Sequence, residues 1–103
     1  MRHPRKATSW WLYVLECEGG VLYTGVTTDV ATRFEAHARG RGARFMRLKR
    51  PVRILATALV ATKGEALRAE HAFKQLSRAE KLRWSASGLE QFVERILATA
   101  REL

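Results

Sequence analysis

The chain has 103 residues, of which 47% are hydrophobic, and it carries 19 lysines and arginines against 10 aspartates and glutamates. This length and composition indicate a single globular domain and exclude an intrinsically disordered chain. The net charge of +9 favours a polyanion as partner, and no apolar run approaches the roughly 20 residues that would cross a bilayer.

The first part of the chain predicts a hairpin behind a basic N-terminal tail at residues 1–8. Residues 9–17 are mostly aromatic and aliphatic, which predicts a strand that is buried along most of its length. A Glu-Gly-Gly turn follows, and residues 21–26 have the composition of the return strand. With the turn centred near Gly19, we expect Tyr13 and Tyr23 to lie close to cross-strand register, within a slip of one residue.

A first helix is predicted to follow the hairpin, with Asp29 as a candidate N-cap. It should run to about residue 38 and stop at the Gly-Arg-Gly segment 40–42. Arg33 and His37 lie four residues apart, at the edge of the apolar face, and the ordinary explanation is a solvent-exposed pair. The expected buried face consists of Val30, Ala31, Phe34 and Ala38.

The second half of the chain predicts a third strand at residues 51–60 and three further helices. Each of these helices is preceded by the spacing of a capping box. The three boxes are Thr62 with Glu65, Ser77 with Glu80, and Ser87 with Glu90. The last helix has apolar residues at helical spacing and should pack on the domain, with a homodimer or protein-partner contact as the alternative.

The predicted order is ββαβαα plus a C-terminal helix, which is an α+β fold with a small three-stranded sheet flanked by helices. We expect the main domain at residues 9–86 and the C-terminal helix at 87–103, packed on the same domain. The lone Cys17 cannot form an internal disulfide, which favours a reducing compartment and a cytoplasmic location.

Five polar side chains are candidates for chemistry, although each one alone has an ordinary structural explanation. Two are tyrosines of the hairpin and two lie on the first helix; the fifth, Glu70, is predicted to be half-buried and to need a cation beside it. That cation is Lys74, one helical turn later, an arginine from the surplus of basic residues, or a metal ion. Together, the five side chains would suffice for phosphodiester hydrolysis. The set is Tyr13, Tyr23, Arg33, His37 and Glu70.

The positive charge is concentrated between Glu35 and Glu65, where the sequence has no acidic residue. A phosphate-binding surface is the functional interpretation, and a solvated basic loop is the structural one. The candidate nucleic-acid-binding cations are Arg39, Arg41, Arg44, Arg47, Lys49 and Arg50, with Lys74 and Lys81 from the later helices.

In their order and spacing these residues resemble the GIY-YIG endonucleases. Tyr23-Thr24-Gly25 matches the second signature element with Thr in place of Ile, and Trp11-Leu12-Tyr13 keeps the tyrosine of the first. The segment from residue 67 to 81, LRAEHAFKQLSRAEK, is most similar to the small stand-alone bacterial members, the YhbQ-like group. The resemblance covers about residues 10–84.

The resemblance implies an antiparallel sheet and a metal-dependent endonuclease that cuts DNA in preference to RNA, in the setting of DNA repair or recombination. One Mg²⁺ or Mn²⁺ ion would be held by Glu70, and Arg33 would stabilise the transition state. Tyr13 would act as the general base, with Tyr23 and His37 in the water and phosphate network; which tyrosine is the base stays open. Gly25 would allow close backbone approach to the nucleic acid. The alternative is a DNA- or RNA-binding module of the same fold with weak or no turnover.

Overall fold

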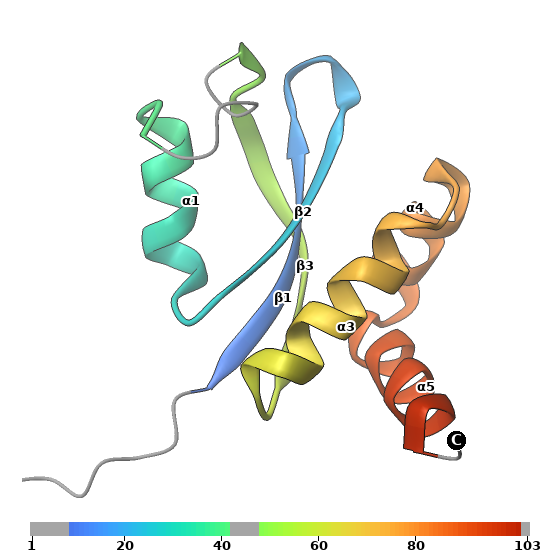
Figure 1. Cartoon of the computed structure of the whole chain (residues 1–103). Helices are drawn as coiled ribbons and strands as arrows, with labels where there is room; N and C mark the ends of the chain where they lie inside the picture. Colours follow the sequence, from blue (N-terminus) through green and yellow to red (C-terminus); the bar gives the residue numbers. More distant parts are fainter. Residues whose placement is uncertain (1–8, 42–47, 102–103) are drawn as a thin grey trace, which may run out of the picture.

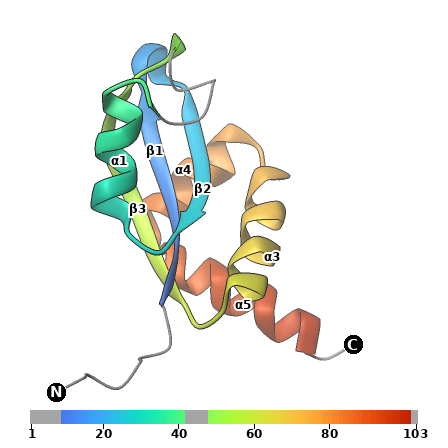
Figure 2. The ribbon, with the colours of Figure 1, turned by 60° about the vertical axis from the view of Figure 1, so that its left-hand side comes forward.

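The structure, a computed structural model, describes residues 9–41 and 48–101. Its elements follow the predicted order, and the α+β fold with a three-stranded antiparallel sheet is confirmed. In chain order they are β1 (Trp10–Cys17), η1 (Glu18–Gly20), β2 (Leu22–Thr27), α1 (Val30–Ala38), β3 (Pro51–Val60), α3 (Lys63–Lys74), α4 (Arg78–Ser87) and α5 (Leu89–Arg101). Figure 1 and Figure 2 show α1 on one face of the sheet and α3, α4 and α5 on the other.

The sheet has the strand order β2-β1-β3, with both pairs antiparallel, so β1 lies in the centre. Tyr13 pairs with Gly25, and Tyr23 pairs with Leu15. The expected pairing of the two tyrosines is therefore wrong by two residues, because a turn centred at Gly19 places residue 25 opposite residue 13. A shift of two keeps every side chain on its face of the sheet, so the two tyrosines are diagonal neighbours on the same face.

The two faces of the sheet bury separate cores. The larger core lies between the sheet and helices α3 and α5, where the rings of Phe73 and Phe92 meet edge to face with centroids 5.3 Å apart. The smaller core lies under α1 and contains Tyr13, Leu15 and Cys17. The side chains of β1 alternate between the two cores, as expected for a strand that is buried on both faces.

Among the residues that the structure describes, α1, α3 and α4 have side-chain caps at their N-termini. The Asp29 side chain accepts from the Thr32 amide, Thr62 caps α3, and Ser77 with Glu80 forms a complete capping box at α4. The third predicted box is wrong, because Ser87 is the last residue of α4 and its hydroxyl donates to the carbonyl of Arg83 instead. Gly88, with φ +143°, separates α4 from α5.

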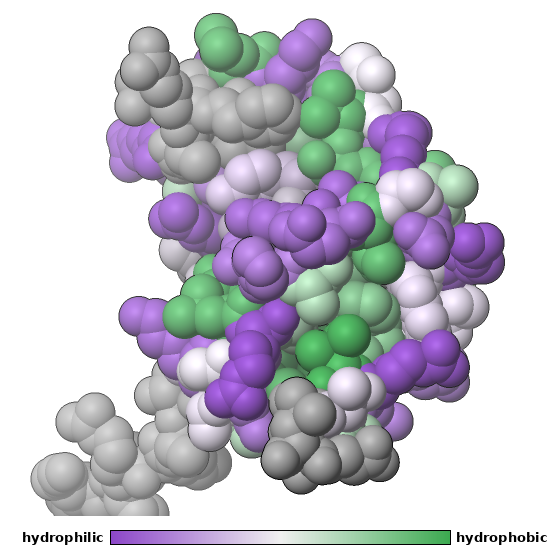
Figure 3. Space-filling view, turned by 45° about the vertical axis from the view of Figure 1, so that its right-hand side comes forward, coloured by the Kyte–Doolittle hydropathy of each residue, from purple (hydrophilic) through white to green (hydrophobic). Residues whose placement is uncertain are grey.

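The surface alternates between apolar and charged areas. Figure 3 shows hydrophobic areas that are separated by hydrophilic side chains over one side of the molecule. Several large apolar side chains of the described residues are exposed, among them Val52 and Leu59 of β3. Within residues 9–41 and 48–101, no helix has the length and apolar character that a membrane span requires.

Candidate active site

Tyr13 lies on the central strand, under α1, and its side chain is 2% exposed. Its ring passes over Gly25 of the neighbouring strand. A Cβ atom added to Gly25 would lie 2.5 Å from the Tyr13 hydroxyl oxygen and 2.7 Å from the ring carbon Cζ. Only glycine leaves room for the ring at this position. The close approach that the sequence suggested for Gly25 is thus made by Tyr13, and Gly25 itself is buried.

The hydroxyl of Tyr13 is hydrogen-bonded to Nε2 of His37, at 3.3 Å. The ring of Tyr23 completes a cluster of three rings, with its centroid 5.4 Å from that of His37 and 6.3 Å from that of Tyr13. His37 is fully buried. The expectation that it lies on an exposed rim is therefore wrong: the end of α1 turns this side chain toward the sheet, where the Tyr13 hydroxyl gives its ring a polar partner.

Arg33 comes from α1, one turn before His37, and it is exposed as predicted. Its guanidinium lowers the pKa of the Tyr13 hydroxyl through hydrogen-bonding capacity and charge, and its charge also lowers the pKa of His37. The face of α1 that meets the sheet is rotated relative to the prediction, because Ala31 is exposed and His37 takes an inner position.

Glu70 comes from α3, the helix on the opposite face of the sheet from α1. Its side chain is 18% exposed, and its negative charge acts on Tyr13. Helix α3 packs on β2, which is also the strand that carries Gly25. The half-buried position predicted for Glu70 is confirmed, and so is its pairing with Lys74, whose Nζ lies 3.3 Å from Oε2.

The surroundings of the site shift two pKa values. Burial, then the neighbouring Tyr23 and Glu70, raise the pKa of Tyr13 to about 12, although Arg33 opposes the shift. Burial and the charge of Arg33 lower the pKa of His37. At neutral pH the phenol is therefore protonated and the imidazole is neutral, so His37 can accept the proton of the Tyr13 hydroxyl through Nε2.

A single carboxylate determines which metal the site can hold. Among the described residues no three His, Cys, Asp or Glu side chains gather as a metal-binding group, which does not fit a zinc centre. Mg²⁺ keeps several water ligands and needs only one or two protein carboxylates, especially where substrate phosphates supply further oxygens. Glu70, half-buried and open on one side, fits that donor set.

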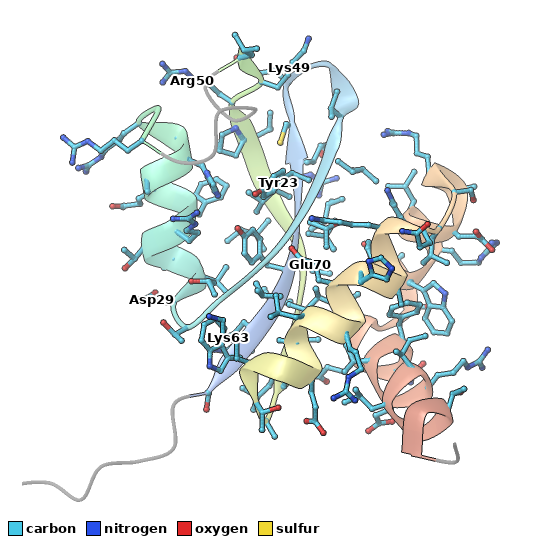
Figure 4. All side chains as sticks on the ribbon, viewed as in Figure 1. Tyr23, Asp29, Lys49, Arg50, Lys63 and Glu70 are labelled. Carbon is cyan, nitrogen blue, oxygen red and sulfur yellow. The ribbon has the colours of Figure 1, made fainter. Side chains whose placement is uncertain are left out.

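The basic residues predicted to bind nucleic acid lie partly at the hairpin end of the sheet. Figure 4 shows Lys49 and Arg50 at that end, beyond Tyr23 and Glu70. Arg50 donates to the carbonyl of Ala38 at 2.7 Å and so caps α1, a role that the sequence did not indicate. The exposed members of the predicted set are Arg39, Arg41, Lys49, Arg50 and Lys74. Lys81 is partly buried on α4, and Arg44 and Arg47 lie outside the described residues.

A cavity of about 290 Å³ lies between the sheet and the start of α1 and was not expected from the sequence. It is lined by Trp11 and Thr57 of the sheet and by Thr28, Asp29 and Val30 at the start of α1. Trp11 is two residues before Tyr13, so both side chains lie on the same face of the sheet. This alternation is the sequence signal that could have placed Trp11 at the cavity.

The chain is similar to several known proteins in sequence and in fold. A family profile described as the GIY-YIG catalytic domain matches residues 9–83. A UPF0213 protein from Cupriavidus pinatubonensis is 50% identical over 82 residues, which cover 80% of this chain and 90% of that protein. A UPF0213 protein from Streptococcus agalactiae is 49% identical over 72 residues, which cover 70% and 82%.

One solved structure is similar in fold. It is the solution NMR structure of the UPF0213 protein BH0048 from Bacillus halodurans, which is 40% identical to this chain. The TM-score is 0.50, and the match covers 80% of this chain and 90% of that one. The sequence comparisons and the fold comparison thus relate the chain to the same group of UPF0213 proteins.

Proposed function

The chain belongs to the GIY-YIG catalytic domain family, and on this basis we propose that it is a divalent-metal-dependent endonuclease that hydrolyses phosphodiester bonds in DNA. The observation that carries the proposal is the convergence on one hydroxyl. His37 is hydrogen-bonded to Tyr13, and Arg33 and Glu70 both act on it electrostatically. These groups come from three separate elements and both sides of the sheet.

Tyr13 and His37 would carry the proton during attack by water. The Tyr13 hydroxyl takes the proton of the water while it passes its own to Nε2 of His37. The relay removes the need for a free phenolate, which a pKa of about 12 would make scarce at neutral pH. A neutral, buried imidazole is a suitable proton acceptor. The lowered pKa of His37 means that its ring is neutral at neutral pH.

Arg33 would stabilise the charge that grows on the phosphate during attack. It is exposed, so a nucleic acid can reach it, and it lies one turn from His37. Guanidinium groups bind phosphate oxygens through two parallel hydrogen bonds. Such donors accelerate phosphoryl transfer because they stabilise the transition state more than the ground state.

Glu70 would hold the divalent cation, Mg²⁺ or Mn²⁺, through its carboxylate. When bound, the cation would polarise the phosphate and neutralise the leaving oxygen. Its carboxylate is half-buried and its charge acts on Tyr13, which supports this role. The scissile phosphate would then lie at the β2 edge, between α1 and α3.

The net charge of +9 supports binding to a phosphate backbone. The exposed cations at the hairpin end would extend the contact beyond the scissile phosphate. We propose DNA in preference to RNA and, for the biological setting, repair or recombination in the cytoplasm.

The proposal is tested with Glu70→Gln, which keeps the shape of the side chain and removes its charge. With Mg²⁺ present, we expect the nicking of supercoiled plasmid and the cutting of branched DNA to fall by at least about a hundredfold, while binding to the same DNA persists. Glu90→Gln, an exposed change on α5, is the matched control and should cut normally.

Two outcomes would contradict the proposal. Unchanged cleavage by the Glu70→Gln variant would remove Glu70 from the mechanism. Failure of the unmodified chain to cut any DNA that it binds with Mg²⁺ present would leave the alternative, a nucleic-acid-binding module without turnover.

A further inference from the structure

Lys74 is the ion-pair partner of Glu70 in this structure. Its Nζ lies 3.3 Å from Oε2, and the two residues are one helical turn apart on α3. The order, with the glutamate before the lysine at i,i+4, is the more stabilising one. The exposure is unequal, because the Glu70 side chain is 18% exposed and the Lys74 side chain is 52% exposed. The carboxylate is thus largely shielded from solvent, whereas the ammonium is carried by a side chain that is half exposed.

A lysine and a divalent cation cannot share this carboxylate without repulsion. A hard cation binds through carboxylate oxygen, and two positive charges within a few ångströms repel each other even near a protein surface. The flexible four-carbon stem of lysine lets the ammonium move by several ångströms without any change in the backbone. Binding of a divalent cation to the Glu70 carboxylate therefore requires the Lys74 ammonium to move away from it.

We propose that Lys74 couples metal binding to nucleic-acid binding: it neutralises Glu70 while no divalent cation is bound, and it is released to bind a substrate phosphate when a cation binds the carboxylate. The inference rests on the proposed metal site at Glu70. It assigns both of the roles that the sequence suggested for Lys74, as partner of Glu70 and as phosphate ligand, to two states of the same side chain.

The strength of the pair suits reversible exchange. An exposed i,i+4 ion pair changes an equilibrium by only about twofold, so Lys74 weakens metal binding without preventing it. Linkage then requires the reverse effect: whatever draws Lys74 away from Glu70, such as a nucleic-acid phosphate, strengthens the binding of the cation. Metal ions would thus be retained best when substrate is present.

The first test measures Mn²⁺ binding by calorimetry, with no nucleic acid present. Lys74→Gln should bind Mn²⁺ about three- to tenfold more tightly than the unmodified chain, because both the competing pair and the repulsion are removed. Arg53→Gln is the matched control: it also removes one positive charge from a glutamate pair, since Arg53 Nε lies 2.7 Å from Glu16 Oε1. Its Mn²⁺ affinity should change by less than about twofold. Equal or weaker binding by Lys74→Gln would overturn the inference.

The second test counts phosphate contacts in metal-free buffer with EDTA. Binding of a labelled duplex oligonucleotide is measured as a function of salt, and each additional phosphate contact steepens the slope of log K against log salt by about 0.9. Glu70→Gln should steepen the slope by up to this amount because it releases Lys74. The double variant Glu70→Gln/Lys74→Gln should return to the slope of the unmodified chain, and Glu16→Gln should not alter it.

The outcomes separate the inference from the proposed function. A steeper slope that persists in the double variant would show that Lys74 makes no new contact, and it would overturn the inference alone. Mn²⁺ binding that is the same in Glu70→Gln as in the unmodified chain would remove the metal site itself. Neither measurement depends on cleavage, so an inactive protein could still confirm the coupling.

Discussion

At the scale of single residues, the site depends on the absence of a side chain at residue 25. Tyr13 and Gly25 are paired across the two strands, and the tyrosine ring occupies the space above the glycine. The hydroxyl therefore lies against β2, where it is hydrogen-bonded to His37 of α1, and α3, which carries Glu70, packs on the same strand. A larger residue at 25 would separate the groups that the proposed mechanism brings together.

We predict that Gly25→Ala displaces the Tyr13 ring and destabilises the fold by about 1–3 kcal/mol, as overpacking of a core does. The displaced phenol gains solvent, so its pKa should fall from about 12 toward its usual value of 10.0. The chain has only two tyrosines, so a spectrophotometric titration can follow this change, and Tyr13→Phe identifies the transition.

Gly64→Ala is the matched control for this change. A Cβ atom at Gly64 would have nothing within 4 Å, and an alanine inside a helix stabilises by up to about 1 kcal/mol relative to glycine. If Gly25→Ala unfolds at the same temperature as Gly64→Ala and keeps the high tyrosine pKa, the packing role of Gly25 is wrong.

At the scale of elements, identical sequence signatures gave different structures. Ser77 and Ser87 both precede a glutamate at the capping-box spacing, but only Ser77 caps a helix. Its hydroxyl accepts from the Glu80 amide at 3.2 Å, and the Glu80 side chain accepts from the Ser77 amide at 2.9 Å. Ser87 remains inside the last turn of α4 because Gly88 is the residue that ends that helix.

We predict that Ser77→Ala lowers the free energy of unfolding by about 1 kcal/mol, since an amide at the start of α4 loses its partner. Ser87→Ala should change it by less than about 0.5 kcal/mol, because the hydroxyl of Ser87 only adds a second donor to the Arg83 carbonyl. Urea unfolding of both variants, followed by circular dichroism, checks the difference. Equal losses would mean that Ser87 contributes a cap after all.

Local patterns predicted the elements of this chain well and their contacts poorly. Strand composition and helix caps act between neighbours in sequence, so the order and type of the elements followed from them. The partners in the site are far apart: Tyr13 and His37 are separated by 24 residues, and no periodicity reports which side of α1 meets the sheet. The resemblance to a family supplied the set of site residues. The pairing of Tyr13 with Gly25 became known only from the register of β1 and β2 in the structure.

At the scale of the whole molecule, the sheet divides the structural core from the proposed chemistry, and the β2 edge joins them. Helices α3 and α5 bury the larger core on one face, and α1 covers the ring cluster on the other. Glu70 is the contribution of the core side to the site. We therefore propose a divalent cation at that edge in spite of the strongly positive charge of the chain.

A second acidic location lies elsewhere in the described residues, although its glutamates do not gather as a group that could hold a metal ion. Three glutamates line a cavity of about 390 Å³ between the end of β3 and α5, together with apolar side chains such as Leu59 and Val93. The glutamates are Glu65, Glu90 and Glu94. They lie away from Tyr13 and His37, so a cation bound there could not serve the proposed reaction.

Paramagnetic broadening of amide NMR signals by Mn²⁺ distinguishes the two locations most directly. Our account predicts saturable broadening centred on Glu70, Tyr13 and Lys74 in the folded chain, and its loss in Glu70→Gln. Broadening centred on Glu90 and Glu94, or a pattern around Glu70 that survives Glu70→Gln, would contradict the claim that these side chains form one metal-dependent site.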